Sequence, residues 1–311
     1  MPRKIIVDCD PGHDDAIALL IAHGSPEIEL LAITTVMGGT TLSDVSQNAL
    51  AVAALGDIRD VPIAAGCGGP LIRSADSAPY LHDGGGGPAL PLPTRALDTR
   101  HAVDVIIETL MREPPGTVTL VPTAALTNIA MAVRKEPRIV ERVAEVVLMG
   151  GAVAGGNRTA AAESNIVTDP EAAHIVFGER WPVTMVGLEL TVQAVATPDV
   201  VDRIAGLGTT PARYVLEVLE FFGGTYLAEQ GLPHPSVHDL CAVARVIDPA
   251  VMTTRRAPIT VELTGTHTRG MTIADLRGPA PPDCHTQVAV DLDHARFWDL
   301  VLDALERIGE P

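Results

Sequence analysis

Four aspartates within eight positions are the most chemically suggestive feature of this 311-residue chain. Asp8, Asp10, Asp14 and Asp15 fall in the stretch "IIVDCDPGHDDAIALL", where an apolar strand pattern gives way to a helical pattern. Asp8 and Asp10 are two positions apart, so within a strand they should project to the same side. Burying a carboxylate is costly unless something compensates its charge, so the cluster calls for a counter-ion.

A hard divalent cation would compensate such a cluster, because calcium and magnesium prefer oxygen ligands such as carboxylates and backbone carbonyls. Helix capping is the competing explanation, since the helix dipole favours carboxylates in the first turn. Capping accounts for Asp14 and Asp15, but not for Asp8 and Asp10 as well. No set of His and Cys residues has the spacing of a zinc site. The pattern therefore favours a metal site with oxygen ligands.

A metal at the end of the first strand should recruit groups from other segments of the chain. Thr123 follows the strand pattern of "TLVPTAALTN", and His238 and Asp239 open a helical pattern in "PSVHDLCAVA". Ligands of open α/β sheets bind beyond the carboxyl ends of the strands, where Asp10 and Thr123 are expected. The adjacent His238 and Asp239 are not a catalytic triad, because triad residues are distant in sequence.

Strand-like apolar runs alternate with helical patterns over the first two thirds of the chain. Strands this apolar are buried on both faces, which is typical of a mainly parallel sheet covered by helices. We therefore predict an α/β fold with an open, mainly parallel but mixed central sheet, in a single domain over residues 1–311. The long irregular segments 66–98 and 150–166 are expected to be functional loops. Later elements are expected near 198–230 (helical), 237–247 (helix), 258–264 and 286–292 (strands), with a final helix.

Composition narrows the class of partner. The formal charge of −17, from 22 Lys and Arg against 39 Asp and Glu, argues against nucleic acid, since no basic run is present. No apolar run is long enough to span a bilayer, and "MPRK" leads into a strand pattern, not a signal peptide. We expect a cytoplasmic protein with no membrane partner, whose four cysteines are reduced.

Several segments together resemble the nucleoside hydrolases of the inosine–uridine-preferring type. They are "DCDPGHDDAIA", "LVPTAALTNIA", "VLMGGA", "GNRTAAAESNIVTDPEAA" and "VHD", which occur in the family order between residue 5 and about 247. The resemblance implies a Rossmann-like fold and hydrolysis of the N-glycosidic bond of ribonucleosides to free base and ribose. It also implies a nucleoside substrate as partner and a homotetramer or homodimer.

The resemblance also implies calcium as the cofactor and gives roles to individual residues. Asp10, Asp15 and Asp239 would be carboxylate ligands of Ca²⁺, and Thr123 would contribute its main-chain carbonyl. Asp10 would also be the general base for a calcium-bound water, in a reaction with an oxocarbenium-like transition state. His238 would assist departure of the leaving base.

Other positions that match the family would bind the substrate, and Asp8 would support the site from behind. The residues expected at the ribose are Asp14, Met149, Asn157, Glu163 and Asn165. His82 matches a histidine on the nucleobase side. Tyr226 and His234 are further expected base contacts, in a stretch where family members often present tyrosines.

One departure from the family lies in "GGTT", residues 38–41, where members commonly carry "GNQT". Gly39 replaces an asparagine that normally reaches the ribose, and Thr40 or a water is a conceivable substitute. The preferred nucleobase is left open by the sequence.

Two competing readings remain. Asp8-Cys9-Asp10 has the Asp-x-Asp form of a haloacid-dehalogenase-like phosphatase, although Pro11 follows where such enzymes have Thr or Val. Alternatively, the loss of asparagine at Gly39 marks a non-catalytic, calcium-dependent nucleoside-binding protein.

Overall fold

The computed structural model describes residues 1–73, 87–230 and 233–309 of the chain. Its central feature is an eight-stranded sheet with the strand order β3-β2-β1-β4-β5-β6-β10-β7. All neighbouring strands are parallel except β7, which pairs antiparallel with β10 at the sheet edge. The strands are β1 (Arg3–Cys9), β2 (Ile28–Thr35), β3 (Ile63–Ala65), β4 (Val118–Pro122), β5 (Val143–Met149), β6 (Val183–Val186), β7 (Met252–Arg256) and β10 (Thr286–Leu292).

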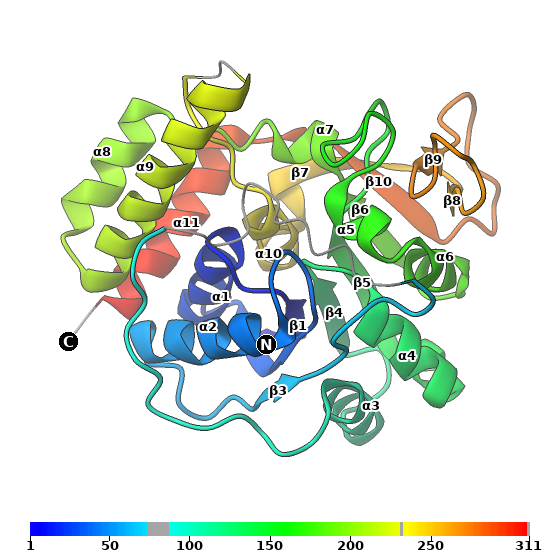
Figure 1. The fold of residues 1–311 in the computed structure, drawn as a ribbon, viewed down its shortest axis with the longest axis horizontal. Coiled ribbons are helices and arrows are strands. Elements are labelled where there is room, and N and C mark those ends of the chain that lie inside the picture. Colours follow the sequence, from blue (N-terminus) through cyan, green and yellow to red (C-terminus); the bar gives the residue numbers. More distant parts are fainter. Residues whose placement is uncertain (74–86, 231–232, 310–311) are drawn as a thin grey trace.

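Helices cover both faces of the sheet and make two hydrophobic cores (Figure 1). One core packs α1 (Asp14–Gly24), α2 (Leu42–Leu55), α8 (Pro198–Leu207), α9 (Thr210–Gln230), α10 (Asp239–Ile247) and α11 (His294–Ile308). The other packs α3 (Ala102–Arg112), α4 (Thr127–Lys135) and α6 (Pro170–Gly178). Smaller elements are α5 (Ser164–Thr168), α7 (Leu188–Thr191), the 3₁₀ turns η1 (Pro137–Glu141) and η2 (Pro249–Val251), and the antiparallel pair β8 (Ile259–Val261) and β9 (Thr272–Ala274).

Strand β1 shows why the apolar runs of the sequence are so continuous. Ile5, Val7 and Cys9 face one core, whereas Ile6 faces the other, and all four side chains are fully buried. A strand in the middle of a sheet covered on both faces needs apolar residues at every position. Asp8, which is also fully buried, is the exception.

The strand order predicts where a ligand binds. The first six strands have the doubly wound order 3-2-1-4-5-6, whose direction reverses between β1 and β4. The loops after these two strands separate there and leave a crevice at their carboxyl ends. Asp10 follows β1 and Thr123 follows β4, so both lie at this switch point.

The predicted fold class is confirmed, and the strand expected near 286–292 coincides with β10. The helical stretch expected near 198–230 is two helices, because Gly208 adopts a left-handed conformation (φ 65°) that ends α8. The strand expected near 258–264 is shorter and pairs with β9, outside the main sheet. The antiparallel strand β7 was not predicted. None of the described helices is long and apolar enough to cross a membrane.

Candidate active site

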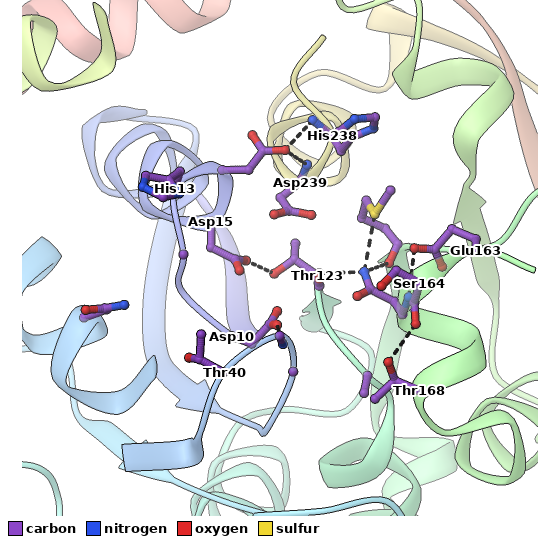
Figure 2. A pocket seen from close by; sticks show the side chains of 18 of the residues that line it. Asp10, His13, Asp15, Thr40, Thr123, Glu163, Ser164, Thr168, His238 and Asp239 are labelled. Atoms are coloured by element: carbon purple, nitrogen blue, oxygen red, sulfur yellow. Dashed lines mark hydrogen bonds between the residues drawn. The ribbon is translucent and has the colours of Figure 1, made fainter. Parts of the chain in front are cut away.

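A cavity of about 480 Å³ opens at the carboxyl end of the sheet, at the switch point (Figure 2). Asp10, Thr123 and Met149 reach it from the ends of β1, β4 and β5. Most of the predicted site residues line it, namely Asp10, Asp14, Asp15, Thr123, Met149, Asn157, Glu163, Asn165, His238 and Asp239. The fold therefore brings together segments more than 200 residues apart.

Two helix N-termini meet at this cavity. Asp14 and Asp15 begin α1, and Asp239 begins α10. The Asp14 Oδ2 atom accepts hydrogen bonds from the main-chain N–H groups of His238 (2.6 Å) and Asp239 (3.2 Å). A carboxylate of one helix therefore caps the other, which fixes both helices at the cavity wall.

Asp15 and Asp239 carry charge that the protein compensates poorly. Asp15 Oδ1 accepts a hydrogen bond from Thr123 Oγ1 at 2.6 Å, yet burial raises its pKa to about 7. Burial also raises the pKa of Asp239 well above its ordinary value, and Asp15, Asp14, Asp10 and Glu163 add to this shift through their negative charge. No lysine or arginine is among the residues that line the cavity in the described part of the chain.

Asp10 is held by the loop after β2. Its Oδ2 atom accepts a hydrogen bond from the Gly39 N–H at 3.1 Å. A Cβ atom at Gly38 would lie 1.6 Å from this oxygen, so only glycine allows the close approach. The "GG" of this loop therefore has a structural reason at Gly38, whereas Gly39 contributes its backbone.

The opposite wall of the cavity is built from the loop that follows β5. Glu163 is buried and caps α5, accepting N–H groups from Asn165 (2.8 Å), Gly151 (2.9 Å) and Ile166 (3.1 Å). Burial raises the pKa of Glu163, and these backbone hydrogen bonds lower it in part. Glu163 therefore shapes this wall as well as lining it.

Two amide side chains complete this wall. Asn165 Nδ2 donates to the main-chain carbonyls of Thr123 (2.8 Å) and Met149 (3.1 Å), so it joins the ends of β4 and β5. Asn157 Oδ1 accepts the Ser164 N–H at 3.0 Å. These contacts hold amide groups at the cavity surface, where they can hydrogen bond to a polar ligand.

The cavity lining suits a hard cation by its chemistry. Its side chains offer carboxylate oxygens, and Asp14 Oδ1 is buried without a hydrogen-bond partner. Asp10 and Asp15 are close enough to share a hydrogen bond. Among the described residues, however, no three His, Cys, Asp or Glu side chains already form a closed metal cluster.

Asp8 does not share the site of Asp10, so the expectation that both project to one side fails. Strand β1 ends at Cys9, and Asp10 lies beyond it. Asp8 points into the sheet face covered by α4, where its Oδ1 accepts hydrogen bonds from Thr34 (2.6 Å) and Asn128 (2.8 Å). It does not line the cavity, which fits a supporting role and contradicts its use as a phosphatase nucleophile.

Three residues predicted to contact the nucleobase are not among those that line the cavity in the described part of the chain. His82 lies outside the described residues, as does the side chain of Tyr226. His234 is described and half-buried, but it is not among the residues that line the cavity.

His13 also lines the cavity and was not predicted. Its ring packs on Phe221 (centroids 4.8 Å apart) and Phe222 (5.8 Å) of α9. The signal was its position within "DPGHDDA", where a histidine sits among carboxylates. Thr40, Asn48, Ser164 and Thr168 also line the cavity, and no pattern in one sequence distinguishes them from ordinary loop residues.

Comparison with known proteins identifies the family of this chain. The family model described as "Inosine-uridine preferring nucleoside hydrolase" matches residues 5–299. A protein of that name from Crithidia fasciculata is 57% identical over 314 residues, covering 100% of both chains. A pyrimidine-specific ribonucleoside hydrolase from Escherichia coli O157:H7 is 40% identical over 301 residues, covering 96% of both.

A solved structure, the purine-preferring ribonucleoside hydrolase from Gardnerella vaginalis, superposes with a TM-score of 0.91 at 33% identity and covers 99% of both chains. The similarity therefore extends over the whole chain in both sequence and structure. The chain belongs to the inosine-uridine preferring nucleoside hydrolases, metal-dependent enzymes that hydrolyse the N-glycosidic bond of ribonucleosides.

Proposed function

We propose that this chain is a calcium-dependent ribonucleoside hydrolase in which Asp10 is the general base for the attacking water. The observation that carries the proposal is the cavity itself. Five aspartates, Asp10, Asp14, Asp15, Asp44 and Asp239, line one cavity at the switch point, and no lysine or arginine of the described residues lines it. Such a site calls for a cation, and oxygen ligands favour a hard divalent cation such as calcium.

The proposed ligands are the carboxylates of Asp10, Asp15 and Asp239 and the main-chain carbonyl of Thr123. That carbonyl accepts a hydrogen bond from Asn165 Nδ2, and its second lone pair can serve a cation. A bound cation supplies Lewis acidity, which lowers the pKa of a water in its shell. The oxygen-only ligand set fits calcium or magnesium, and the choice of calcium follows the resemblance to the family.

The remaining steps belong to side chains of the protein. Asp10 takes a proton from the water whose oxygen bonds to the anomeric carbon of the ribose. The Gly39 N–H holds the Asp10 carboxylate, which keeps the base aimed at the cavity. Asp14, Asn157, Glu163 and Asn165 are proposed to fix the ribose hydroxyls, with Met149 as an apolar wall.

His238 is proposed to give a proton to the base as the glycosidic bond breaks. His238 lines the cavity on the side opposite Asp10, and its main-chain N–H donates a hydrogen bond to Asp14 Oδ2 (Figure 2). Protonating the leaving nitrogen avoids release of an anionic base, which contributes about 10²–10⁴-fold in rate for general acids.

We propose that both inosine and uridine are substrates. The 57% identical relative is named for these two nucleosides, whereas relatives with lower identity are named for pyrimidine or purine preference. Membership of an enzyme family decides against the alternative of a non-catalytic nucleoside-binding protein. The cytoplasmic location, the single domain and the homotetrameric or homodimeric assembly stay predictions.

A reducing-sugar assay on a panel of purine and pyrimidine ribosides tests this function. We expect ribose release from inosine and uridine that is lost in EDTA and restored by calcium. Asp10→Asn should lower kcat by about 10²–10⁴-fold while the circular dichroism spectrum is retained. Asp303→Asn, an exposed change on α11, is the matched control. Near-normal turnover by Asp10→Asn would overturn the role of Asp10.

A further inference from the structure

Helix α7 brings a buried hydroxyl group against the ring of His238. Thr191, the last residue of α7, is fully buried, and its Oγ1 atom lies 2.8 Å from His238 Nδ1. Thr191 does not line the cavity, so it cannot touch the substrate directly. Its effect on the reaction must therefore pass through His238.

The hydrogen bond between the two side chains has a preferred direction. The Thr191 hydroxyl also faces the Leu188 carbonyl at 3.5 Å, the back-bond that a helical threonine commonly makes to the preceding turn. A hydroxyl that donates to this carbonyl offers its lone pairs to His238, so Nδ1 carries the proton. The other ring nitrogen, Nε2, then lies on the side of the ring away from Thr191.

Hydrogen bonds from Gln193 and Ser236 hold the end of α7, and with it Thr191, in place. Gln193 Nε2 donates to the carbonyls of Glu189 (2.7 Å) and Val290 (3.0 Å), which ties α7 to β10. Ser236 Oγ donates to the Val192 carbonyl at 3.1 Å, which ties α7 to the segment just before His238. The hydroxyl group and the histidine therefore share one rigid frame.

The geometry points to Thr191 as a positioning residue that orients the His238 ring for protonation of the leaving base. This inference rests on the proposed role of His238. In the imidazolium form of His238, Nδ1–H donates to Thr191 and the second proton, on Nε2, is the one that His238 can hand to the base. Without the hydroxyl group, the ring loses this hydrogen bond, and the fraction of correctly oriented histidine falls.

The test compares substrates that differ in their need for a proton. The purine base of inosine is a poor leaving group that needs a proton, whereas 4-nitrophenyl riboside releases a stable phenolate without protonation. In Thr191→Val, we expect the ratio of kcat for inosine to kcat for the nitrophenyl riboside to fall about tenfold, the worth of one hydrogen bond. Thr191→Ser, which keeps the hydroxyl group, should restore the ratio to within about twofold of the wild type.

Thr286→Val is the matched structural control. Thr286 is buried in β10 and donates to the Ala257 carbonyl, so the change removes one buried hydroxyl group away from the cavity. It should not change the ratio. An unchanged ratio in folded Thr191→Val, or an equal fall for both substrates, would overturn the positioning role.

His238→Ala separates this inference from the function on which it rests. If His238→Ala lowers the ratio and Thr191→Val does not, the role of Thr191 is wrong and that of His238 stands. If His238→Ala leaves the ratio unchanged, the leaving-group role of His238 is wrong, and the inference about Thr191 falls with it.

Discussion

Replacing Asp15 by asparagine should make the protein more stable than the wild type in the absence of metal, and less stable than the wild type when calcium is bound. The buried Asp15 carboxylate has its pKa raised from 3.8 to about 7, first because burial removes it from water. Each unit of this difference corresponds to about 1.4 kcal/mol, so the ionised group costs up to about 4 kcal/mol at pH 8. Asparagine removes the charge and still accepts the Thr123 hydroxyl.

In EDTA at pH 8, Asp15→Asn should therefore unfold at a higher temperature than the wild type. At about 2 °C per kcal/mol for a chain of this size, the increase is up to about 8 °C. The folded-state pKa lies above the unfolded value, so the penalty is complete above pH 7 and fades as the pH falls towards 4. The advantage of the variant should shrink accordingly between pH 8 and pH 5.

In millimolar calcium the wild type should unfold at a higher temperature than Asp15→Asn. The bound cation then compensates the charge of the Asp15 carboxylate, and its binding stabilises the folded wild type. Thermal unfolding followed by circular dichroism, with Asp303→Asn as a surface control, measures both arms. The reasoning is refuted if Asp15→Asn is no more stable than the wild type in EDTA at pH 8. The calcium site is refuted if calcium stabilises both proteins equally.

Three further changes test other contacts of the cavity. Gly38→Ala places a Cβ atom where the Asp10 carboxylate lies, so kcat should fall about a hundredfold with little loss of stability. A wild-type kcat in steady-state kinetics would contradict this. Glu163→Gln sets an amide N–H₂ against backbone donors such as the Gly151 N–H, and urea unfolding should show about 1–3 kcal/mol of lost stability. Gly39→Asn supplies a side-chain amide beside the ribose and should raise kcat/KM for inosine about 2–10-fold, whereas a fall in kcat/KM would show that this loop has adapted to glycine.

The fold class was accessible from the sequence because burial on both faces leaves continuous apolar runs. Strand β1 is an example, with Ile5, Ile6 and Val7 buried against two different cores. The edge strand β7, with the sequence "MTTRR", is largely exposed and polar, so it carries no such signal. Strand order also depends on long-range packing that periodicity does not encode.

The candidate site was predicted unevenly, for physical reasons. Asp10, Thr123 and Asp239 follow or begin elements that the sequence delimits well, so their meeting could be anticipated. The separation of Asp8 from Asp10 could not, because it depends on the strand ending at Cys9. The contact between Thr191 and His238 joins two segments 47 positions apart and has no local pattern at all.

The carboxylates of the cavity divide according to the donors that the protein offers them. Glu163 accepts three backbone N–H groups and Asp14 accepts two, so these carboxylates are stabilised by the fold. Asp15 accepts the Thr123 hydroxyl, but its other hydrogen-bond partner is Asp10, itself an acid, and the neighbours that raise the pKa of Asp239 are all acidic. The two least compensated carboxylates are thus proposed metal ligands, while the two best compensated shape the walls. A cation should therefore bind where the backbone has left charge unmatched, and its removal should strain Asp15 and Asp239 before it disturbs Glu163 and Asp14.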